Sequence, residues 1–101
     1  MEARYVISPY DHVIRNISER EGNDWRLMSA IAYHESRFTA DIVSRRGARG
    51  LMQIMPAVAR QFDVVTEEAL LDPETNVLLA NKVWNRIDST LDLPARISEK
   101  D

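Results

Sequence analysis

Residues 35–36 read Glu-Ser, and residues 47–56 read Gly-Ala-Arg-Gly-Leu-Met-Gln-Ile-Met-Pro. The first stretch places a carboxylic acid near the end of a predicted helix. The second stretch carries two glycines, which permit tight turns, and ends in a proline of the kind that starts helices. Together the two stretches predict one half of an active site, in which a helix supplies an acid and a loop supplies ligand contacts.

The helix that carries Glu35 can be predicted from spacing alone. Asp24 is a favourable N-cap residue, and residues 25–37 contain no Gly or Pro. Apolar residues at helical spacing mark its inward face: Leu27, Met28, Ile31 and Ala32. Glu35 follows Ile31 by four residues, so we expect its side chain to lie on the same, buried face.

Burial would change the chemistry of Glu35. Ionised carboxylates are seldom buried unless they are paired, and desolvation favours the neutral form that can donate a proton. We therefore expect Glu35 to be able to act as a general acid. The alternative is that the helix ends at Glu35 and that its carboxylate reaches solvent or pairs with Arg37 or another arginine.

The rest of the chain also predicts helices joined by short loops. Ser8-Pro9 and Asp11 indicate a first helix that ends at Gly22, and Pro56 indicates a short helix through Phe62. Residues 39–50 lack periodicity, which predicts a loop with tight turns at its glycines. Thr66 is expected to cap a turn, and Asp72-Pro73 to begin a final helix. That helix carries an apolar stripe: Val77, Ala80, Trp84, Ile87 and Leu91.

Length and composition fit one small domain. The chain has 101 residues, of which 45% are hydrophobic, enough for a single core. We therefore expect one all-α domain over residues 1–101, with any sheet vestigial. The net charge of −3 argues against nucleic-acid binding, which requires a strongly basic face. With two histidines and no cysteine, the sequence predicts neither a disulfide nor a metal site, and no cofactor.

Longer motifs around Glu35 resemble a known family. The stretches are His34-Glu35-Ser36-Arg37-Phe38, then Ser44, Gly47-Ala48, Gly50-Leu51-Met52-Gln53-Ile54-Met55-Pro56 and Ala59, followed by Asp72-Pro73 and Asn76. These residues resemble the lytic transglycosylases, goose-lysozyme-like enzymes that cut bacterial peptidoglycan. The flanking Ser-Pro-Tyr-Asp at residues 8–11 and Asp-Trp-Arg-Leu at residues 24–27 look most like the membrane-bound F-type branch. The resemblance runs from about Ser8 to Leu91.

The resemblance implies a fold and a chemistry. The fold would be lysozyme-like, and Glu35 would act first as the acid and then as the base. It would cleave the bond between N-acetylmuramic acid and N-acetylglucosamine, with a 1,6-anhydro product. By the same resemblance Met52 and Gln53 line the glycan cleft, Gly50 and Ser36 support substrate binding, and the enzyme works in the periplasm or cell envelope.

Other interpretations of the same residues remain open at this point. Ser36 could instead bond the helix backbone, and Met52 could be ordinary core. Trp25, Tyr33 and Trp84 could be sugar-stacking platforms, although aromatics at helical spacing are more often core. At the level of function, the alternatives are a catalytically silent peptidoglycan-binding or protein-interaction module and a goose-type lysozyme hydrolase.

The chain also departs from the family pattern. Family members usually continue into an Ala-Tyr-Asn-Ala-Gly-like motif, and nothing after Leu91 resembles it. We therefore expect that the C-terminal part of the domain is missing, and that the exposed edge left behind could support a homodimer. The first residues show no export signal, and nothing resembles a membrane-spanning run, so membrane association would need an anchor outside this chain.

Overall fold

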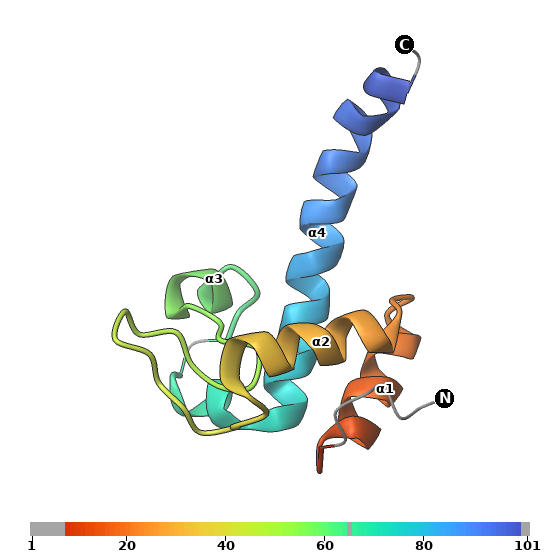
Figure 1. Cartoon of the computed structure of the whole chain (residues 1–101). Coiled ribbons are helices and arrows are strands. Elements are labelled where there is room, and N and C mark those ends of the chain that lie inside the picture. The colour runs from red at the N-terminus through yellow and green to blue at the C-terminus, as the bar shows by residue number, and fades with distance from the viewer. Residues whose placement is uncertain (1–7, 65, 100–101) are drawn as a thin grey trace.

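The computed structural model describes residues 8–64 and 66–99, with side chains as far as Ile87. Its elements are α1 (Asp11–Arg20), α2 (Trp25–Ser36), α3 (Pro56–Arg60), the 3-10 helix η2 (Glu68–Leu71) and α4 (Pro73–Glu99) (Figure 1). Within these ranges the extended contacts are isolated bridges, Val43 with Arg49 and Arg49 with Ile54. The prediction of an all-α fold with a vestigial sheet is confirmed.

Side-chain caps begin α2 and α4, as predicted. The Asp24 carboxylate accepts a hydrogen bond from the Arg26 N–H at 3.0 Å and starts α2. The Asp72 carboxylate accepts one from the Thr75 N–H at 3.0 Å and starts α4. Ser8 hydrogen-bonds with the Asp11 carboxylate through both its N–H and its hydroxyl, so the predicted signal forms a turn that leads into α1, whose first residue is Asp11.

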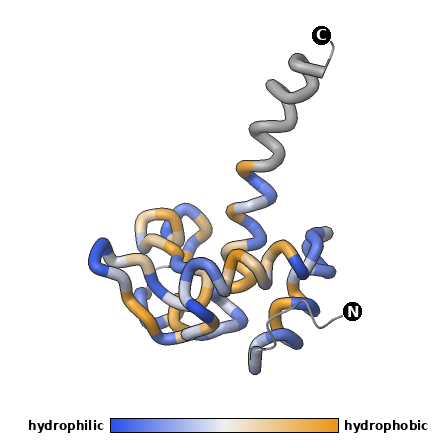
Figure 2. The backbone as a smooth tube through the Cα atoms, in the orientation of Figure 1, coloured by the Kyte–Doolittle hydropathy of each residue, from blue (hydrophilic) through white to orange (hydrophobic). Residues whose placement is uncertain are grey.

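The core lies where α1, α2 and the first part of α4 meet the loop after residue 50, α3 and η2. Its buried apolar residues are Ile14, Ile17, Met28, Ala32, Leu51, Met52, Ile54, Ala59, Leu70, Val77, Leu79 and Ala80. Figure 2 shows apolar segments gathered in this body, while the turns at its periphery are polar. None of the helices in the part of the chain that the structure describes is long and apolar enough to cross a membrane.

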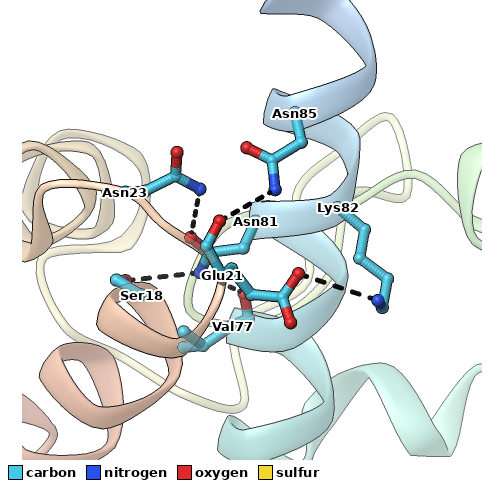
Figure 3. Close-up of polar contacts among 7 residues, drawn as sticks. All are labelled: Ser18, Glu21, Asn23, Val77, Asn81, Lys82 and Asn85. Carbon is cyan, nitrogen blue, oxygen red and sulfur yellow. Dashed lines mark hydrogen bonds and ion pairs between the residues drawn. The ribbon is translucent and has the colours of Figure 1, made fainter.

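A buried polar network joins the end of α1 to α4 (Figure 3). Asn81 is fully buried, and its side-chain oxygen accepts a hydrogen bond from the Asn23 amide at 2.8 Å. Its own amide donates to the Ser18 hydroxyl at 3.3 Å, and the Asn85 amide donates to the Glu21 carbonyl at 3.3 Å. Because buried polar groups are costly unless paired, this network fixes the α1–α2 turn against α4.

Several predicted details need correction. Leu27 is 39% exposed, so its assignment to the inward face is wrong. The short helix after Pro56 ends at Arg60 rather than at Phe62, which lies in the turn that follows. On the final helix Trp84 and Ile87 are 36% and 48% exposed, because α4 extends away from the body and few elements cover it there (Figure 1). The expected place of Leu91 in the stripe lies outside the described side chains.

Candidate active site

A groove of about 460 Å³ lies between α2, the segment 52–58 and α4. This volume is ordinary for a small-molecule or sugar-binding site. Two of its lining residues are polar, Glu35 from α2 and Gln53 from the loop. Its apolar lining includes Met28, Ile31, Met55, Val83, Trp84 and Ile87. The groove therefore places one carboxyl and one amide among apolar walls.

Glu35 lies in this groove but is exposed, so the prediction that it is buried is wrong. Its predecessors on the helix face, Met28 and Ala32, are 1% and 0% exposed. Glu35 stands on the last turn of α2, beyond the part of this face that the core covers. Among the described residues its carboxylate forms no hydrogen bond or ion pair, and the Arg37 guanidinium donates instead to the Tyr33 hydroxyl at 2.7 Å. The acid is therefore open to a ligand.

Gly50 shapes the loop from inside the protein. Its φ is +83°, and a Cβ at this position would overlap the Leu70 carbonyl and the Asn76 amide. Its N–H donates to the Ile42 carbonyl at 2.9 Å. The glycine is therefore required by close packing against neighbouring protein atoms. It is buried and does not line the groove.

Asn76 holds the loop in place and has a role that residue-by-residue reasoning missed. It is fully buried, and its side-chain oxygen accepts a hydrogen bond from the Met52 N–H at 2.7 Å. Its amide donates to the carbonyls of Arg49 at 3.0 Å and Leu70 at 2.8 Å. In the sequence, the only signal for this role was that Asn76 matches the asparagine of the family motif, which follows Asp72-Pro73. Through these bonds α4 positions Met52, whose side chain is 5% exposed and lines the groove.

Gln53 presents an acceptor to the groove. Its backbone adopts φ +54°, and its side-chain amide donates to the carbonyls of Gly50 at 2.9 Å and Ile42 at 3.2 Å. These bonds use both amide hydrogens. The side-chain oxygen has no partner in the described part of the chain, so Gln53 offers a ligand an acceptor.

Ser36 lies behind the groove rather than in it. It is 3% exposed, and its hydroxyl donates to the Ala32 carbonyl at 3.1 Å. The same hydroxyl accepts a hydrogen bond from the Thr39 N–H at 3.2 Å. This geometry matches the alternative in which Ser36 bonds the backbone at the helix end. Of the predicted site residues, the structure brings together Glu35, Met52 and Gln53.

A family model described as the transglycosylase SLT domain matches residues 12–94. The chain belongs to this family. The membrane-bound lytic murein transglycosylase F of Alteromonas mediterranea is 37% identical over 77% of this chain, and that of Stutzerimonas stutzeri is 32% identical over 91%. The chain spans only 16% and 18% of the length of these two relatives.

Solved structures share the fold of this SLT domain. An inactive Glu-to-Gln mutant of lytic transglycosylase Slt from Pseudomonas aeruginosa superposes with a TM-score of 0.72 and 26% identity, over 83% of this chain and 15% of its own. The soluble lytic transglycosylase of 70 kDa from Escherichia coli gives 0.71 and 27%, over 81% and 14%. The lysozyme-like transglycosylase fold expected from the motifs is confirmed.

The three aromatic residues expected as sugar-stacking platforms occupy different environments in the SLT domain. Trp25 lies beside the guanidinium groups of Arg15 and Arg26, 5.5 and 5.8 Å from its ring centroid. The Tyr33 ring lies 5.6 Å from that of Phe38 and is outside the groove. Trp84 alone of the three expected platforms lines the groove with Glu35. Within the described ranges no group of three His, Asp or Glu side chains could hold a metal ion.

Proposed function

We propose that this SLT domain cleaves peptidoglycan as a lytic transglycosylase, with Glu35 as general acid and base. The observation that carries the proposal is that Glu35 is the one acidic residue among the described residues that line the groove. Two further facts support it. The relatives are named lytic murein transglycosylases, and a Glu-to-Gln mutant of the Pseudomonas aeruginosa enzyme is inactive.

A single carboxyl suits this reaction. Most glycosidases flank the scissile bond with two carboxyl groups, one of which acts as nucleophile or as base toward water. In the proposed reaction Glu35 protonates the glycosidic oxygen that leaves C1 of N-acetylmuramic acid. It then takes the proton of the 6-hydroxyl of the same sugar, whose oxygen bonds to C1 and closes the 1,6-anhydro ring. One group thus serves both proton transfers, and no water is consumed.

The exposure of Glu35 fits a site that the substrate completes. A glycan strand in the groove would cover the carboxyl and remove water from it, which strengthens the interaction of the acid with the glycosidic oxygen. Gln53 would accept a hydrogen bond from an acetamido N–H or a hydroxyl of the sugar. Met52 would contribute apolar contact, while Ser36 and Gly50 would act through the backbone geometry of α2 and the loop.

The test is digestion of purified peptidoglycan, with products identified by mass spectrometry. The wild-type chain is expected to release anhydro-muropeptides, and Glu35→Gln is expected to release none. Glu74→Gln is the matched control, because Glu74 is also exposed but lies on the first turn of α4, outside this groove. Anhydro products from Glu35→Gln at the wild-type rate would refute the proposal.

The other functions give different results in the same assay. Products with reducing ends that depend on Glu35 would indicate a goose-type hydrolase. Binding of glycan strands without any product would indicate a catalytically silent wall-binding module. One observation favours the silent module. Among the described residues, no partner holds the Glu35 carboxylate in one position.

We further propose that the domain acts in the periplasm or cell envelope, where its substrate is found. The relatives are named as membrane-bound enzymes of murein, which supports this location. We also propose that two copies can associate through the exposed edge of the domain, where apolar side chains of α4 such as Ile87 remain in water. Light scattering across a concentration series tests this, and a monomer at all concentrations would refute it.

A further inference from the structure

We propose that Trp84 is the platform on which one sugar ring of the glycan stacks within the Glu35 groove. The inference rests on the proposed function, because it names the residue that orients the substrate for Glu35. It selects one of three aromatic candidates that the sequence could not distinguish.

The surroundings of Trp84 leave its ring available to a ligand. The side chain is 36% exposed, and it makes no hydrogen bond or ring contact with another described residue. The other tryptophan, Trp25, already lies against two guanidinium groups. A large aromatic side chain left partly in water at the wall of a groove retains apolar area that a ligand can bury.

The position of Trp84 matches the amphipathic character of a pyranose ring. Such a ring presents C–H groups on its faces and hydroxyl or acetamido groups around its edge. In this groove the aromatic surface comes from α4, while the acid Glu35 and the acceptor Gln53 come from α2 and the loop. A sugar whose C–H face lies on Trp84 would direct its polar edge toward those two groups.

The remaining lining fits the substituents of an N-acetylated sugar. Met55 and Ile87 are 39% and 48% exposed and line the same groove as Trp84. They can take up the methyl groups of the acetamido and lactyl substituents, which would otherwise remain in water. The groove therefore suits an N-acetylated hexosamine, such as those of peptidoglycan, better than a plain hexose.

Fluorescence can follow Trp84 directly, because the chain has two tryptophans. In Trp25→Phe the emission comes from Trp84 alone, and an added Glu35→Gln substitution prevents cleavage during the titration. The probe is a purified tetrasaccharide of alternating N-acetylglucosamine and N-acetylmuramic acid. A saturable blue shift and protection from acrylamide quenching are expected, because a stacked sugar removes water from the indole.

Substitutions at Trp84 separate stacking from structural support. Trp84→Leu keeps apolar volume but removes the aromatic face and is expected to weaken binding about tenfold, whereas Trp84→Phe is expected to restore most of it. In the cleaving enzyme, Trp84→Leu should raise KM more than it lowers kcat. Thermal melting checks that both variants are folded.

Three results would overturn the inference. If calorimetry shows that the tetrasaccharide binds but the Trp84 emission does not change, or if Trp84→Leu binds as tightly as wild type, the stacking role is wrong and the proposed function stands. If the wild-type chain neither binds nor cleaves glycan, both the stacking role and the proposed function are overturned.

Discussion

The loop that lines the groove should depend on a single buried amide, that of Asn76. Asn76→Ala removes three hydrogen bonds, all made to main-chain groups: the Met52 N–H and the carbonyls of Arg49 and Leu70. At about 1 to 1.5 kcal/mol for each bond, the expected loss in the free energy of unfolding is about 3 to 4 kcal/mol. Domains of this size have only about 5–15 kcal/mol in total.

Urea denaturation followed by circular dichroism measures this loss. The same change should lower the melting temperature by at least about 12 °C, since a domain of this length loses about 4–8 °C per kcal/mol. Asn85→Ala is the matched control, because the Asn85 amide makes one 3.3 Å bond to the Glu21 carbonyl. Its expected loss is about 1 kcal/mol or less. Equal losses in the two variants would refute the role assigned to Asn76.

Two further predictions concern the backbone. Gly50→Ala should destabilise the protein by at least about 2 kcal/mol more than Gly22→Ala, because both glycines have positive φ but a Cβ meets other atoms only at Gly50. Thermal melting compares them, and equal losses would show that the contact with Leu70 and Asn76 can relax. Asp24→Ala should cost about 1 kcal/mol by removing the cap of α2, whereas Asp24→Asn, which keeps an acceptor, should melt close to wild type.

The helices were predictable because their ends are specified locally. The Asp24 carboxylate accepts a hydrogen bond from the N–H two residues later, and the Asp72 carboxylate accepts one from the N–H three residues later. These caps can therefore be predicted without knowing the tertiary structure. The same holds for the positive φ of Gly47 and Gly50, which an aperiodic run with two glycines predicts. The family motifs then allowed the fold to be predicted from these local helices.

The exposure of Glu35 could not be predicted from helical periodicity. Spacing shows that Glu35 shares a face with Ile31, but it does not show how far along α2 that face is covered. Coverage depends on where the loop and α4 lie. Leu27 was misassigned for the same reason. Helical spacing places it in the same apolar stripe as the buried Met28, yet Leu27 is 39% exposed.

Residue type alone also could not separate ligand contacts from internal contacts at Ser36 and Gly50. A hydroxyl beside an acid and a glycine in a loop are both compatible with a binding site, and both are compatible with the interior. At Gly50 the choice is made by a partner distant in the sequence, Asn76, whose amide would overlap a Cβ at residue 50 once α4 packs against the loop. At Ser36 it is made by backbone groups nearby in the sequence, those of Ala32 and Thr39.

Helix α4 therefore controls the geometry of the groove through three of its residues. Through Asn76 it holds the segment that carries Met52, and through Trp84 it forms a wall of the groove itself. Through Asn81 it also holds the turn that precedes α2, the helix that carries Glu35. The position of the acid relative to the loop and to the aromatic wall is thus set by buried amides on one helix. These amides fix the backbone that carries the acid, while the Glu35 carboxylate itself remains exposed to a ligand.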